Sequence, residues 1–168
     1  KSKNVPLEWS DEKNVKWKMA VPGKGFSSPV IFNQQIWMTS AENEGKSLHA
    51  ICLDKTSGKL IHNIKVITTD DAGPRHRLNG YASPTPVIDK EHVFVHFGPR
   101  GTACLNKKGE VIWKNTDLNY NVIQGGASSP ILYNDVLFLT CDGIDFQFLV
   151  ALEKQTGKVK WKQDRAHL

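Results

Sequence analysis

Two aspartates, Asp142 and Asp145, lie three positions apart around a glycine in the segment CDGIDF. Carboxylates at such short spacing can serve as ligands of Ca²⁺, which takes roughly six to eight oxygen atoms in proteins. One pair supplies too few oxygens, so a calcium site would need carboxylates or carbonyls from another loop. We therefore predict no metal site here.

Paired serines at positions 27–28 and 128–129 carry hydroxyl groups of the kind that act as nucleophiles when a base lies beside them. Both pairs precede a short apolar segment, and Ser83 lies shortly ahead of another. Recurrence at equivalent places favours an architectural role, in which the hydroxyl satisfies nearby backbone groups. We predict no catalytic residue.

The three cysteines, Cys52, Cys104 and Cys141, show no CxxC spacing and no adjacent pair. Neither a zinc site nor a redox motif is indicated, and an odd count argues against a disulfide framework. We expect small buried thiols, and His96 is expected to be packed in the interior. The other histidines share no spacing typical of metal ligands: His49, His62, His92 and His167.

The composition is that of a globular chain, with 168 residues, 39% hydrophobic and 23% charged. The net charge of +5 comes from scattered lysines. Without a basic stripe interleaved with aromatic residues, no nucleic-acid partner is expected. No apolar stretch approaches the roughly 18 residues of a transmembrane helix. The sequence starts at Lys1 with neither Met nor a signal-peptide core, so we expect it to begin inside a longer gene product.

The elements that must position these residues follow from one pattern that occurs three times. When Pro29, Pro86 and Pro130 are superposed, each is followed by a short apolar run, a turn and a second apolar run. Two more apolar runs complete each copy, and no helical periodicity is sustained. The units cover approximately residues 23–62, 81–113 and 125–161.

Four-stranded units of roughly 40 to 50 residues are typical of β-propeller blades. Consecutive apolar residues, as in the run Val93–Val95, indicate strands buried on both faces. A β-sandwich would show cleaner alternation of polar and apolar residues. We predict an all-β fold, a single partial propeller of about three blades with four antiparallel strands each.

A glycine recurs in the last turn of each copy, where a positive φ would suit a hairpin. Trp113 and Trp161 each follow their glycine by four positions, and the first copy has His62 in that place. Trp17 lies ahead of the first copy, as the terminal tryptophan of a preceding blade would. The residues predicted to hold the blades together are Gly58, Gly109, Gly157, Trp17, Trp113 and Trp161.

The segment ALEKQTGKVKW, residues 151–161, resembles the tryptophan-docking motif of quinoprotein-type propellers. The segments LEWSDEKNVKWK and YASPTPV are similar to the secreted PQQ-like β-propeller repeat proteins of planctomycete-type bacteria. The resemblance implies that the tryptophan joins neighbouring blades, that further blades complete the ring, and that the protein is periplasmic or extracellular.

Loops that differ between the copies are the expected place for binding, because variable loops on a rigid scaffold commonly carry function. The clearest is the insertion TTDDAGPRHRLNG, residues 68–80. Strand order places it at the same end as loops 41–47, 98–101 and 142–146. The candidate ligand-binding residues are Asp70, Asp71, Arg75, His76, Asn79, Arg100, Asp142 and Asp145. The alternative is that these side chains are solvated or make turn hydrogen bonds.

The function predicted from these features is a non-catalytic binding or scaffold propeller that acts through one loop face in the cell envelope. Expected partners are the remaining blades and a protein or glycan of the envelope, with no cofactor. The resemblance also implies an alternative, part of a PQQ- and calcium-dependent alcohol or sugar dehydrogenase. Such an enzyme would be expected to show an adjacent cysteine pair, a tryptophan beneath the cofactor and calcium ligands, none of which can be matched here. A third possibility is a propeller attached to a haem or kinase module.

Overall fold

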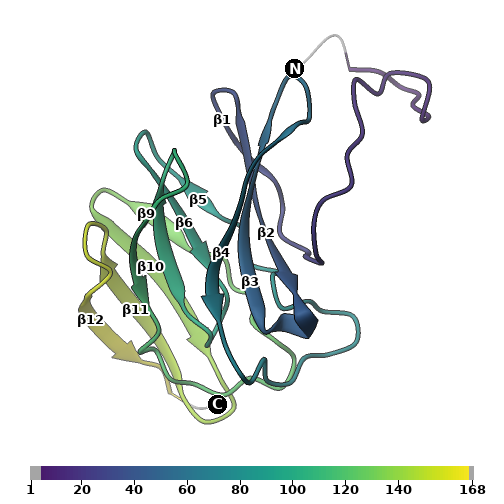
Figure 1. The fold of residues 1–168 in the computed structure, drawn as a ribbon. Coiled ribbons are helices and arrows are strands. Elements are labelled where there is room, and N and C mark those ends of the chain that lie inside the picture. The colour runs from purple at the N-terminus through teal and green to yellow at the C-terminus, as the bar shows by residue number, and fades with distance from the viewer. Residues whose placement is uncertain (1–4, 167–168) are drawn as a thin grey trace.

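The computed structural model describes residues 5–166, which form three four-stranded antiparallel sheets standing face to face (Figure 1). The first sheet contains β1 (Val30–Phe32), β2 (Gln35–Glu42), β3 (Ser47–Asp54) and β4 (Leu60–Thr68). The second contains β5 (Val87–Ile88), β6 (His92–His96), β7 (Thr102–Asn106) and β8 (Val111–Asn115). The third contains β9 (Ile131–Tyr133), β10 (Val136–Asp142), β11 (Gln147–Glu153) and β12 (Val159–Asp164). The all-β prediction is confirmed.

The connections in each sheet repeat the same meander, with each strand paired to the next along the chain. A short 3-10 turn, Asn43–Gly45, joins β2 to β3, and no α-helix occurs among the described residues. No helix in this part of the chain is long and apolar enough to cross a membrane. The fourth strand of the first sheet continues to Thr68, past the approximate end of the first predicted unit.

The middle sheet is buried on both faces, which explains its consecutive apolar residues. Val93 and Val95 of β6 pack into the cluster shared with the first sheet, beside Trp37. Phe94, between them, packs into the cluster shared with the third sheet, beside Leu137. Successive side chains of a strand point to opposite faces, so an uninterrupted apolar strand is what a sheet between two neighbours requires.

The cysteines lie in these interiors and are free thiols. Cys52 and Cys104 stand directly opposite His62 and Trp113 on the neighbouring strand. A small side chain at this place leaves room for the ring. All three thiols are almost fully buried, and burial raises the pKa of each to about 12. They are therefore protonated at neutral pH and poor nucleophiles.

At the contact between the second and third sheets, a tryptophan ring packs against a glycine. The Trp113 indole lies against Gly157, and its Nε1 donates a hydrogen bond of 2.8 Å to the carbonyl of Lys154. Trp17 repeats this arrangement on the first sheet: it lies against Gly58, and its Nε1 donates to the carbonyl of Lys55 at 3.0 Å. The two turns are equivalent, so the pre-strand segment around Trp17 stands where a neighbouring blade would place its last strand.

The contact between the first and second sheets differs because His62 replaces tryptophan. Gly109 lies against His62, and the adjacent aromatic partner is Trp37, whose ring centroid is 5.9 Å from that of His62. The carbonyl of Lys107, equivalent to that of Lys154, accepts its hydrogen bond from Gln35 Nε2. The larger Trp37 ring of the second strand thus stands beside the smaller histidine.

The outer face of the third sheet is open. Every residue of β12 is exposed, and Trp161 has 41% of its surface accessible. Its ring contacts Phe138 of its own sheet, with centroids 5.8 Å apart. An exposed apolar sheet face of this kind is typical of an interaction surface.

Candidate functional site

The loops predicted to form one face lie together at the lower end of the sheets in Figure 1. They comprise the β2–β3, β6–β7 and β10–β11 connections and the long segments that lead from β4 to β5 and from β8 to β9. The β4–β5 segment is bonded to the β8–β9 segment, because the His76 amide and the Asn79 side chain both donate to the carbonyl of Gln124. This loop face is therefore one connected surface.

Several of the predicted ligand-binding residues are used to hold this surface together. Asn79 also accepts hydrogen bonds from the Gly80 amide and from the Ser83 hydroxyl. Arg100 donates from Nε to the carbonyl of Ala72 at 3.1 Å, which ties the β6–β7 loop to the insertion. Asp71 accepts from the amide of Gly73 at 2.7 Å and so closes a turn.

The two aspartates of the CDGIDF segment are also paired within the chain. Asp145 accepts from both the amide and the side chain of Asn121, and these bonds together with one from the Phe146 amide hold its pKa below the usual value. Asp142 accepts two short hydrogen bonds from Arg165 Nη1. The two carboxylates thus face different partners.

The side chains of Asp70 and His76 do not bond one loop to another among the described residues. Asp70 is exposed, and its carboxylate contacts no donor among residues 5–166. His76 is exposed, and its Nδ1 accepts a bond from the amide of Leu78 at 3.2 Å. Within the described part of the chain, no three His, Cys, Asp or Glu side chains are grouped as a metal would require. His167 lies outside the described residues.

A groove of about 1190 Å³ opens on the loop face. Its walls are the segment that precedes β1, the end of β2 with the β2–β3 turn, and the stretch from Arg75 to Tyr81. Arg75 and Asn79 are the predicted residues that line it. The charged and aromatic lining residues that the sequence reasoning did not select are Lys24, Phe26, Glu42, Glu44, Arg77 and Tyr81.

The signal for these missed residues was weak. Arg77 lies within the insertion and Tyr81 follows it directly. Glu42 and Glu44 belong to the predicted loop 41–47, in which the sequence singles out no binding residue. Lys24 and Phe26 precede the first strand, in a segment whose repeat suggested architecture alone. Only the chain path brings these three segments together.

The wall of the groove is built around Tyr81. Its ring lies against Gly45, which has a φ of 90° and whose missing side chain leaves room for the ring. Asn43 and Glu44 also have positive φ, at 49° and 55°. Three consecutive left-handed residues are costly for non-glycine side chains, and such strain is found at binding surfaces. The turn thereby directs Glu44 outward at the rim.

Beside the groove, Ser47, His49 and Asn63 form a hydrogen-bonded chain. His49 Nε2 is 2.9 Å from Ser47 Oγ, and His49 Nδ1 is 2.7 Å from Asn63 Oδ1. This order resembles a nucleophile, a base and an orienting group. Ser47 is only 5% exposed and does not line the groove, so the contacts serve to fix the start of β3.

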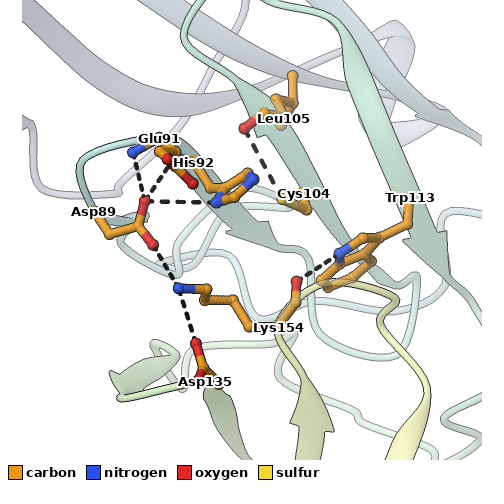
Figure 2. A network of polar contacts seen from close by, with 8 residues as sticks. All are labelled: Asp89, Glu91, His92, Cys104, Leu105, Trp113, Asp135 and Lys154. Atoms are coloured by element: carbon orange, nitrogen blue, oxygen red, sulfur yellow. Dashed lines mark hydrogen bonds and ion pairs between the residues drawn. The ribbon is translucent and has the colours of Figure 1, made fainter.

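A second polar cluster lies at the opposite end of the sheets, and Figure 2 shows it. Lys154 reaches from the third sheet to Asp89 of the second at 3.3 Å and to Asp135 of its own sheet at 3.2 Å. Asp89 also accepts hydrogen bonds from the amides of Glu91 and His92. Burial opposes ionisation of Asp89, yet these bonds and Lys154 hold its pKa below the usual value.

Replacing Lys154 by Met is expected to raise the pKa of Asp89 and to lower the melting temperature, because a carboxylate that is three-quarters enclosed loses its cation. The pKa is followed by NMR titration of the Asp89 carboxyl. Lys158→Met removes the same charge from an exposed position in the same sheet and serves as the control. An equal response in both variants would contradict a specific bridge.

No protein-family model matches the chain, and no curated protein matches it in sequence. Among solved structures, it is similar to a europium-containing methanol dehydrogenase, with a TM-score of 0.65, 12% identity, and coverage of 86% of this chain and 25% of that one. It is also similar to the quinohemoprotein alcohol dehydrogenase of Comamonas testosteroni, with a TM-score of 0.59, 14% identity, and coverage of 84% and 21%.

BamB from Moraxella catarrhalis aligns with a TM-score of 0.49, 13% identity, and coverage of 83% and 35%. By the coverages given above, the chain spans about a quarter of the methanol dehydrogenase and about a fifth of the alcohol dehydrogenase. At these identities the likeness concerns the fold alone, which is that of β-propeller blades.

Proposed function

We propose that this chain is part of a β-propeller that acts as a binding module of the cell envelope, and that its partner contacts the groove on the loop face. The observation that carries the proposal is the groove itself, which is lined by three cations, two carboxylates and two aromatic rings. Polar groups that converge on a concave surface are typical of recognition sites. The envelope location rests on the resemblance of the sequence to secreted repeat proteins.

The loop face also has the rigidity that binding requires. The predicted residues outside the groove, such as Arg100 and Asp145, bond one loop to another. These bonds limit the loop motion that a partner would otherwise have to arrest, and preordering of this kind favours affinity. Residues such as Arg100 and Asp145 thus fix the shape of the loop face, whereas the charged residues that line the groove face the solvent.

The dehydrogenase alternative requires a calcium ligand set in addition to PQQ. Residues 5–166 do not bring three His, Cys, Asp or Glu side chains together, and Asp142 and Asp145 are each bonded to other residues. The described part of the chain therefore does not fit the metal.

Site-specific photo-crosslinking tests the proposal. A photoreactive residue in place of Arg77, in the groove, is expected to crosslink a defined partner from an envelope fraction. The same residue in place of Lys108, an exposed position in the β7–β8 turn at the opposite end, is expected not to do so. Equal crosslinking from both positions, or none from Arg77, would refute the loop-face assignment.

A second assay separates binding from catalysis. Addition of PQQ and calcium to the full protein, followed by alcohol-dependent dye reduction, is expected to give no turnover. Reduction of the dye would instead establish the dehydrogenase alternative.

A further inference from the structure

The charged side chains of the groove differ in whether they have partners among the described residues. Lys24, Arg77 and Glu44 are exposed, and none of their side chains forms a hydrogen bond or an ion pair with another described residue. The carboxylate of Glu42 approaches His49 Nε2 at 3.7 Å, toward the face of the first sheet. The groove therefore presents more free positive than negative charge to a ligand.

Arg75 is held in a fixed orientation at the wall of the groove. One of its terminal nitrogens donates to the carbonyl of Asn79 at 3.0 Å, and the guanidinium carbon lies 5.1 Å from the centroid of the Tyr81 ring. Tyr81 is itself fixed by Gly45 and by a hydrogen bond from its hydroxyl to the carbonyl of Gly73. A guanidinium held in this way keeps further N–H donors for a carboxylate at a reduced entropic cost.

An apolar surface lies beside these cations. Phe26 is 66% exposed, and its ring lies against Gly80, where a side chain would collide with it. The ring therefore packs against the backbone at Gly80, and the rest of its surface is accessible to a ligand. A ligand that places a carboxylate near Arg75 or Arg77 could cover this ring with an aliphatic side chain, which would remove apolar area from water.

We infer that the groove binds an acidic peptide segment, with its carboxylates on Arg75 and Arg77 and a neighbouring apolar side chain on Phe26. This inference rests on the proposed function, because it names the ligand class of the same groove. Two guanidinium groups that can each form charge-assisted hydrogen bonds favour carboxylates over neutral amides. The exposure of these cations implies that binding weakens with added salt.

Fluorescence anisotropy with labelled peptides tests the inference on the full chain. One probe contains Asp, Glu and Leu residues, and its matched probe contains Asn and Gln in place of the acids. The acidic probe is expected to bind at least about tenfold more tightly than the neutral one, since charge-assisted hydrogen bonds are lost in the latter. Equal affinity for both probes would overturn the inference.

Matched charge variants locate the site. R75Q combined with R77Q is expected to weaken binding of the acidic probe at least about tenfold. K59Q combined with K108Q removes the same charge from exposed turns at the opposite end and is expected to leave the affinity unchanged. If both pairs weaken binding equally, the acidic peptide is attracted by net charge alone and the inference is wrong.

Two single variants show whether a loss of binding is caused by unfolding. R77Q alters a side chain without a structural contact, and F26S removes the exposed ring, so each should weaken binding while the melting temperature stays nearly constant. If the acidic probe fails to bind while Arg77 still crosslinks a partner, the ligand class is wrong and the proposed function stands. If both experiments fail, the proposed function fails with it.

Discussion

Gly157→Ala is expected to lower the free energy of unfolding by about 3 kcal/mol, which combines left-handed backbone strain with overpacking. Gly157 has a φ of 69°, a region that costs a side chain energy. An added Cβ would lie 2.3 Å from Cε3 of Trp113, so the indole must move. That movement would also strain its hydrogen bond to the Lys154 carbonyl. Gly157→Val adds a branched side chain and is expected to be worse.

A double-mutant cycle separates the collision from the strain. Trp113→Ala alone is expected to cost about 3–5 kcal/mol, as for other buried aromatic rings. Added to that background, Gly157→Ala should cost only about 1 kcal/mol, because the ring is gone and only the backbone strain remains. Urea unfolding followed by circular dichroism measures all four proteins. Additive costs would show that the glycine is required for the turn and not for the tryptophan.

The second large effect concerns acid stability and His96. This side chain is 1% exposed, Nδ1 lies 2.8 Å from Thr102 Oγ1, and burial lowers its pKa to about 4. Below a pH of about 6.5 the His96 imidazole is protonated in the unfolded chain but stays neutral in the folded protein. The free energy of unfolding therefore falls as the pH drops from about 6.5 to about 4. By pH 4 the loss from this group amounts to about 3 kcal/mol.

His96→Thr is expected to remove this part of the pH dependence. Thr39 and Thr140 occupy the equivalent place in the other two repeats, so threonine is compatible with the strand. The smaller residue leaves a cavity and lowers stability at neutral pH, but the slope of stability against pH between 6.5 and 4 should become shallower. His76→Thr, at an exposed site, is the control. Parallel slopes for wild type and His96→Thr would show that His96 does not titrate as inferred.

The repeat made the fold predictable because each copy carries the same local information. Prolines before the first strand, apolar runs and a glycine in the last turn each specify a piece of the same unit, and their coincidence in three copies leaves little choice of architecture. The thiols at Cys52 and Cys104 were placed in the interior for the same reason, since a repeated small residue indicates a repeated steric need.

The replacement of tryptophan by His62 shows where that reasoning ends. Aligned copies reveal that the indole is missing, but only the structure shows that Trp37 stands beside His62 and that Gln35 donates the hydrogen bond to the Lys107 carbonyl. Both compensating residues lie on the second strand, far from His62 in sequence. A different residue in one strand is thus compensated by residues in another strand, which it meets only through contacts across the sheet.

The candidate groove was predicted only in part, and the reason is similar. Loop position pointed to the end of the sheets where the groove opens and selected Arg75 and Asn79, which line the groove. It could not tell that Arg100 and Asp145 would be used to bond loops together. A polar side chain in a loop has the same appearance in the sequence whether its partner is water, a neighbour or a ligand.

The all-β class, the number of sheets and the interior places of the thiols follow from the sequence, because they depend on local spacing that every copy repeats. Which charged side chains lack a partner depends on the packing of the sheets. Lys24, Glu44 and Arg77 come from three segments separated by complete strands, and they face one groove only because the sheets bring those segments together. The closely spaced Asp142 and Asp145, which first suggested chemistry, instead bind Arg165 and Asn121 and stabilise the loops around them.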